Sequence, residues 1–253
     1  MATIAHVSDI HCGRTGFKPK LLAACIKEIN KLKPDAVVVT GDLTISGYKE
    51  NYQLAKKYLS KLKSKTLVIP GNHDSRLRGY EYFDEFFGHG NTFLDLPGIS
   101  IIGIDTTIPD LDEGNVGRGK LRWLVSELKK RPETNLKIVA MHHHLVSIPH
   151  TGRERSTVSD AGDVLNALVD AGVDLILCGH KHTPHSWLVN SVAIVNAGSI
   201  SAVKLRAYIN NSYNIIRIEK DSIEVFLKEI GKKPEHMVKY FTSSSKEGLV
   251  VKR

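Results

Sequence analysis

Short apolar runs alternate with amphipathic segments along most of the chain. Runs of five or six residues rich in valine, isoleucine and leucine are typical of buried strands at residues 3–7, 35–40, 65–70, 136–141 and 174–178. Elsewhere apolar residues recur every three or four positions, which predicts helices over residues 20–32, 48–62, 76–87, 120–130 and 160–171. This alternation predicts an α/β domain whose strands are covered on both faces.

The pattern changes after residue 182. Strands are predicted at residues 185–189, 192–196, 213–218 and 222–227, with hairpin turns at Asn190-Ser191 and Lys220-Asp221. A further strand pair, residues 92–96 and 99–104, flanks Pro97-Gly98. We therefore expect one domain over residues 1–230, followed by a polar, basic tail over residues 231–253 that is partly disordered.

Composition limits the class of protein but does not identify a reaction that it catalyses. The 253 residues carry a net charge of +8 and are 42% hydrophobic, which suits one globular domain with an anionic substrate. The chain has no apolar run long enough to span a bilayer and no signal peptide at its start, so we expect a cytoplasmic protein with no membrane partner. Cys12, Cys25 and Cys178 are widely spaced and are expected to be free thiols.

Polar side chains follow five of the predicted strands. They are Asp9 with His11, Asp42, Asn72 with His73, His142, and His180 with His182. Sites in open α/β sheets form outside the carboxyl ends of strands, so these side chains predict one site. Imidazole nitrogen with carboxylate and amide oxygen suits Mn, Fe, Zn, Co or Ni better than Ca or Mg. Of these eight side chains, even seven ligands would be too many for one tetrahedral ion, and they suit two ions that share a carboxylate.

The motifs carry a family resemblance. Asp-x-His at Asp9, Gly-Asp-x-Thr at Gly41, Gly-Asn-His-Asp at Gly71, a histidine after a strand, and Gly-His-x-His at Gly179 occur in this order. This order resembles the calcineurin-like binuclear metallophosphoesterases, and its spacing is nearest to small prokaryotic cyclic-nucleotide-type phosphodiesterases. The resemblance implies a four-layer αββα double β-sandwich with the site at the edge of the sheets.

The resemblance also implies a role for each motif residue. One metal would be held by Asp9, His11 and His182, the other by Asn72, His142 and His180, with Asp42 as the bridge. A hydroxide between the two ions would attack phosphorus. His73, held by Asp74, would stabilise charge or protonate the leaving oxygen. His144 is an alternative to His142, because residues two apart on a strand share a side.

Four arginines next to these motifs are candidates for binding phosphate, although each is equally well explained as a solvated surface residue: Arg14, Arg76, Arg153 and Arg155. We expect the loop over residues 147–156 to border the substrate opening. The leading hypothesis is a metal-dependent phosphoesterase that hydrolyses a small phosphodiester, possibly a cyclic nucleotide, or a phosphomonoester. Alternatives are a nuclease acting on nucleic acid, a protein or sugar-nucleotide phosphatase, and a scaffold without metals or catalysis.

Overall fold

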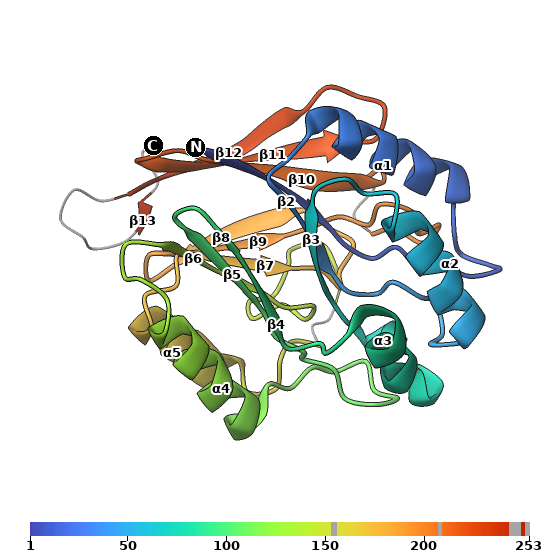
Figure 1. Ribbon diagram of the computed structural model, residues 1–253, viewed down its shortest axis with the longest axis horizontal. Helices are drawn as coiled ribbons and strands as arrows, with labels where there is room; N and C mark the ends of the chain where they lie inside the picture. The colour runs from blue at the N-terminus through green and yellow to red at the C-terminus, as the bar shows by residue number, and fades with distance from the viewer. Residues whose placement is uncertain (153–155, 207–208, 243–248, 251–253) are drawn as a thin grey trace.

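Two stacked β-sheets with helices on both outer faces make up the fold (Figure 1). The structure, a computed structural model, describes residues 1–152, 156–206, 209–242 and 249–250. Its layers follow the order helix, sheet, sheet, helix, which confirms the predicted αββα double sandwich. None of the helices in these described ranges combines the length and the apolar character needed to cross a membrane.

The first sheet has the order β13-β12-β11-β10-β1-β2-β3. Its strands are β1 (Ala2–Val7), β2 (Ala36–Thr40), β3 (Lys65–Ile69), β10 (Ser212–Ile218), β11 (Ser222–Glu229), β12 (Glu235–Thr242) and β13 (Leu249–Val250). β1, β2 and β3 run parallel, whereas β10 pairs antiparallel with β1 in the register Ile4 to Ile216. The three parallel strands therefore end at one edge of the sheet.

The second sheet has the order β4-β5-β6-β7-β9-β8. Its strands are β4 (Thr92–Leu96), β5 (Ile99–Gly103), β6 (Leu136–Ala140), β7 (Leu175–Cys178), β8 (His185–Val189) and β9 (Val192–Asn196). β5, β6, β7 and β9 are parallel, and hairpin partners β4 and β8 close the two edges.

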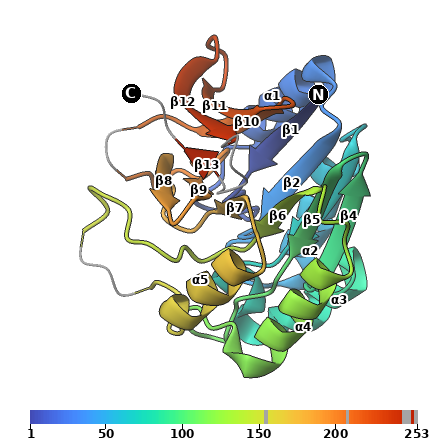
Figure 2. The ribbon, with the colours of Figure 1, turned by 90° about the vertical axis from the view of Figure 1, so that its left-hand side faces the viewer.

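The helices pack on the outer faces of the sheets. They are α1 (Pro19–Leu32), α2 (Lys49–Leu59), α3 (Gly79–Phe87), α4 (Gly117–Lys129) and α5 (Ala161–Asp170), with the 3₁₀ segment η1 (Asn72–Arg78) before α3. α1, α2 and α3 cover the first sheet, and α4 and α5 cover the second (Figure 2). Pro19 begins α1 at the first helical position, where its missing N–H costs no hydrogen bond.

Strand alternation explains the fully apolar runs. On β2, Val38 faces the core between the sheets, while Val37 and Val39 face the core under the helices. Because successive side chains of a strand point to opposite faces, a strand covered on both sides must be apolar throughout.

The first sheet continues past residue 230, where the sequence predicted the domain to end. β12 pairs with β11 over most of its length, and Tyr240 and Leu249 are buried in the core between the sheets. Glu235, His236 and Lys239 interrupt the apolar residues of β12 and obscured this strand in the sequence. The first sheet therefore extends to residue 250, while residues 243–248 and 251–253 lie outside the described residues.

Candidate metal centre

The predicted ligands lie on the turns that follow β1, β2, β3, β6 and β7, so both sheets contribute to the site. The backbone bends sharply in each of these turns. Asp9, His11, Asp42, His180 and His182 all have positive φ angles, between 51° and 72°. Left-handed backbone is uncommon for residues other than glycine and concentrates at functional sites.

One group of ligand atoms lies at the ends of β1, β2 and β7. Nε2 of His11 is 2.9 Å from Nε2 of His182 and 3.5 Å from Oδ2 of Asp42. Oδ1 of Asp9 is 3.2 Å from Nε2 of His182. These four residues each offer one ligand atom, and all four atoms lie within 4.8 Å of one another.

A second group lies beside the first, on the side of β3 and β6. Oδ1 of Asn72 is 3.1 Å from Nε2 of His142 and 3.0 Å from Nδ1 of His180. Nε2 of His142 is 3.4 Å from Oδ1 of Asp42. The two carboxylate oxygens of Asp42 therefore face different groups, as a bridging ligand requires.

Backbone carbonyls fix two of the imidazole rings. Nδ1 of His142 donates a hydrogen bond to the carbonyl of Thr40 at 2.7 Å, and Nδ1 of His182 donates to the carbonyl of Lys204 at 2.7 Å. A hydrogen on Nδ1 leaves the lone pair of a neutral ring on Nε2, which is the nitrogen that faces the ligand group. Such partners orient metal-binding histidines and set their tautomer.

The electrostatics of the buried groups suit cations. Burial lowers the pKa of His11 to about 3 and that of His180 well below its usual value, so both rings are neutral at pH 7. Burial alone would lower the pKa of His182, but the charge of Asp9 raises it. Oδ1 of Asp9 is buried and accepts no hydrogen bond. A buried anionic oxygen without a donor is the kind of atom that a metal ion satisfies.

The neighbouring histidines differ from His142 in their surroundings. Nε2 of His143 donates to the carbonyl of Asp112 at 3.2 Å, so its Nδ1 accepts the hydroxyl hydrogen of Thr106 at 2.7 Å. His143 lies near His142 and His180, but these bonds occupy both of its ring nitrogens. The ring of His144 stacks on that of His180. The geometry therefore favours His142 as the ligand on this strand.

The structure corrects the predicted partnership of His73 and Asp74. Nδ1 of His73 lies 2.6 Å from the carbonyl of Ile45 and donates to it, so Asp74 does not hold this ring. The Asp74 carboxylate instead accepts the N–H groups of Gly71, Leu43 and Thr44 and the Thr44 hydroxyl. The tight turn after Gly71 points Asp74 back toward the β2 loop, so Asp74 ties together the turns after β2 and β3.

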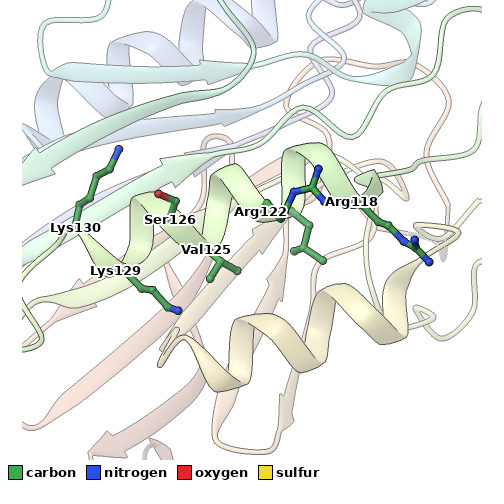
Figure 3. A pocket seen from close by; sticks show the side chains of 7 residues that line it. Arg118, Arg122, Val125, Ser126, Lys129 and Lys130 are labelled. Atoms are coloured by element: carbon green, nitrogen blue, oxygen red, sulfur yellow. The ribbon is translucent and has the colours of Figure 1, made fainter.

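A cavity of about 330 Å³ opens over the ligand groups. Its lining includes His11, Asp42, Asn72, His73, His180 and His182, together with Arg76, Asp112, Lys204 and Arg206. A larger cavity of about 680 Å³ lies on α4, where Arg118, Arg122, Val125, Ser126 and Lys129 project from the helix (Figure 3). None of the ligand residues lines that second cavity, so the smaller one is the candidate site.

The predicted arginines have different positions. Arg76 lines the cavity, with Nη2 2.5 Å from Oδ1 of Asp112. Arg14 is exposed and does not line the cavity, whereas Arg153 and Arg155 lie outside the described residues.

Sequence reasoning missed three polar residues of the cavity: Asp112, Lys204 and Arg206. Asp112 accepts a hydrogen bond from Nδ2 of Asn72 at 3.0 Å, which turns Oδ1 of that amide toward the ligand histidines. It lies nine residues after the end of β5, so its position relative to a strand did not mark it. Lys204 and Arg206 carry no such signal either.

The comparison with protein families agrees with the geometry. The model of the calcineurin-like phosphoesterases matches residues 2–184. The chain belongs to this family. Calcineurin-like phosphoesterases use a binuclear metal centre, and the two ligand groups fit two ions with Asp42 between them. Residues 2–184 contain all seven predicted ligands.

Curated relatives of this calcineurin-like phosphoesterase are bacterial phosphodiesterases. A probable glycerophosphodiester phosphodiesterase from Arcobacter nitrofigilis is 33% identical over 218 residues, which cover 78% of each chain. A 3',5'-cyclic-nucleotide phosphodiesterase from Nostoc is 28% identical over 191 residues, which cover 71% of each chain.

Solved structures share the fold at low sequence identity. A dimetal phosphatase from Danio rerio superposes with a TM-score of 0.71 at 11% identity, covering 93% of this chain and 98% of the other. A purple acid phosphatase from yellow lupin superposes with a TM-score of 0.77 at 12% identity, covering 97% of this chain and 55% of the other. These likenesses show that the double sandwich is the metallophosphoesterase fold.

Proposed function

We propose that this calcineurin-like phosphoesterase hydrolyses small phosphodiesters with two metal ions bridged by Asp42. The arrangement of the Asp42 carboxylate carries the proposal, because Oδ2 lies 3.5 Å from Nε2 of His11 and Oδ1 lies 3.4 Å from Nε2 of His142. Asp9, His11 and His182 complete one ligand set, and Asn72, His142 and His180 complete the other. Nitrogen and oxygen donors of this kind favour Mn, Fe, Zn, Co or Ni.

The metal pair, when bound, supplies Lewis-acid stabilisation and a water of lowered pKa. The chain's own residues position the substrate around it. Arg76 reaches the cavity with a guanidinium that can pair with a phosphate oxygen. His73 is anchored through Nδ1 to the Ile45 carbonyl, so Nε2 is the nitrogen left to donate a proton or a hydrogen bond to the leaving oxygen.

Two classes of phosphodiester follow from the relatives: glycerophosphodiesters and cyclic nucleotides. The cavity supports a small substrate, since 330 Å³ is near the lower end of the usual range for ligand pockets. We infer that the phosphate and one compact alcohol group fill it.

A substrate panel on metal-reconstituted protein tests the proposal. The panel holds glycerophosphodiesters, cyclic nucleotides, phosphomonoesters and single-stranded DNA, and Asp42→Ala is the matched inactive variant. We expect hydrolysis of small phosphodiesters by the wild type alone. Protein that binds two metals per chain but hydrolyses nothing on the panel would support the scaffold hypothesis instead. Activity confined to DNA, with a steep dependence on salt, would support the nuclease hypothesis.

A further inference from the structure

Four exposed apolar residues lie within three positions of residues that line the metal cavity. Large apolar residues exposed within the described part of the chain are Met1, Tyr48, Leu77, Tyr80, Phe93, Leu111 and Val203. Leu77 directly follows the cavity residue Arg76, Leu111 directly precedes Asp112, and Val203 lies between Ala202 and Lys204. Tyr48 lies three positions after the cavity residue Ile45. We call Tyr48, Leu77, Leu111 and Val203 the apolar rim.

Backbone contacts join the segments of the apolar rim into one arc. The N–H of Val203 donates to the carbonyl of Gly16 at 2.9 Å, and Gly16 lines the cavity beside Ile45. Gly47, which precedes Tyr48, packs so closely that a Cβ there would lie 2.2 Å from the carbonyl oxygen of Arg76. The N–H of Leu77 donates to Oδ1 of Asp110 at 2.9 Å. The four residues therefore belong to segments that adjoin one another beside the cavity.

Exposure of these side chains has a free-energy cost that a ligand could relieve. Leu77 and Val203 are each 55% exposed, Tyr48 54% and Leu111 47%. Single exposed apolar residues are ordinary on protein surfaces, but several around one polar cavity mark a binding surface. The cavity they surround is polar, with the exposed cations Lys204 and Arg206 on its wall.

The basic cavity and the apolar rim together indicate the chemical class of the ligand. An anionic group fits the basic, ligand-lined cavity, and an apolar group fits the surface immediately outside it. The cavity holds only about 330 Å³, so the remainder of any longer ester must extend over the opening. We infer that the apolar rim binds the hydrocarbon chain of a phosphodiester whose alcohol is a long-chain alcohol or an acylglycerol, so that the enzyme acts on esters of this class. This inference rests on the proposed phosphodiesterase function.

A chain-length series tests the inference directly. The substrates are alkyl 4-nitrophenyl phosphates from methyl to octyl, which share one leaving group and are used as monomers below their micelle concentrations. For the wild type, we expect kcat/KM to rise about twofold per added methylene, roughly half the effect of complete burial because the rim covers one side of the chain. The rise should come from KM and end where the chain outgrows the rim.

A matched pair of variants assigns the effect to the rim. One carries Leu77→Asn, Leu111→Ser and Val203→Ser; asparagine suits position 77 because Leu77 has a left-handed backbone, with φ 50°. The control is Phe93→Ser, which removes an equally exposed aromatic side chain from β4, beside a different cavity. We expect the triple variant to lose the dependence on chain length while its methyl-ester kinetics and metal content stay unchanged. Phe93→Ser should keep the dependence.

Three results would overturn the inference. The first is a flat chain-length series in wild-type protein that hydrolyses the methyl ester, and the second is a series that survives in the triple variant. The third is light scattering that shows a wild-type oligomer and a monomeric triple variant, since the rim would then be a contact between copies of the chain. Failure to hydrolyse even the methyl ester would contradict the proposed phosphodiesterase function instead.

Discussion

Replacing Asp112 should weaken one metal position and spare the other. Oδ1 of Asp112 accepts hydrogen bonds from Nδ2 of Asn72 at 3.0 Å and from Nη2 of Arg76 at 2.5 Å. The amide of Asn72 can present either its oxygen or its nitrogen to the histidines, and only the oxygen is a metal ligand. Asp112 favours the orientation with oxygen toward His142 and His180.

The size of the effect follows from this hydrogen bond. A hydrogen bond to a charged group is worth about 1.5–3 kcal/mol, but the Asp112 side chain is 64% exposed, so we take about 1–1.5 kcal/mol. A difference of 1.4 kcal/mol corresponds to about a tenfold change in a binding constant. Asp112→Ala should therefore weaken the position that uses Asn72 by about tenfold, at the low end of the effects seen for outer-shell partners.

Metal titration in competition with a chromogenic chelator measures both positions in one experiment. Asp112→Asn keeps an acceptor oxygen and should recover part of the affinity. Glu113→Gln is the matched control, because it removes a neighbouring exposed carboxylate that lines neither ligand group. Equal weakening of both positions, or the same loss in Glu113→Gln, would mean that Asp112 acts through general charge and that our account of Asn72 is wrong.

Three further predictions concern the same centre. His73→Ala should lower turnover by roughly 10²–10⁴-fold, less for esters with a nitrophenol leaving group, while elemental analysis still finds both metals. Asp42→Ala should lose at least one of two metals per chain and nearly all activity with every leaving group; retention of both metals would refute the bridge. The charges of Asp42 and Asp9 raise the pKa values of His142 and His182 against the effect of burial, so metal binding must displace protons from them. Because these pKa values are raised, apparent metal affinity should increase as pH rises above the usual histidine value of about 6.5, and titrations that show no dependence on pH from acidic to mildly alkaline conditions would contradict this.

The sequence was most informative where both faces of an element are buried. β2 and β7 could be predicted because neither face tolerates a polar side chain, and the change to Asp or His at their ends marked the site. β12 was missed because Glu235, His236 and Lys239 interrupt its apolar residues, although Tyr240 lies in the core. Tyr240 is buried against residues distant in the sequence, such as Trp187, whose carbonyl accepts its hydroxyl hydrogen, and local pattern does not record such contacts.

Adjacency in the sequence was a poor guide to side-chain partnership. Asp74 follows His73, but the 3₁₀ turn sends the two side chains in different directions, one to the β2 loop and one to the cavity. Asp112 reaches Asn72 across 40 residues. Candidate ligands could be named from residue type and strand position, whereas the partners that orient these side chains depend on how the loops fold over one another.

The rigidity of the centre depends largely on the main chain. Carbonyls of Thr40, Ile45 and Lys204 orient the rings of His142, His73 and His182. No side-chain substitution removes a carbonyl, so the orientation of these rings depends on loop position alone.

Asp74 and Gly179 fix that position. Asp74 is fully buried, and burial with the nearby charge of Asp42 raises its pKa to about 6, so it is ionised at neutral pH and its four donors satisfy the charge. Because those donors lie on the loops that carry Asp42 and Asn72, this one carboxylate sets the distance between the proposed bridge, Asp42, and the second ligand group. Gly179 allows the two sheets to meet, since a Cβ there would lie 1.9 Å from the hydroxyl of Ser8. A binuclear site shared by two sheets therefore needs two features. Gly179 allows the sheets to approach closely, and the hydrogen bonds of Asp74 hold the loops after β2 and β3 together.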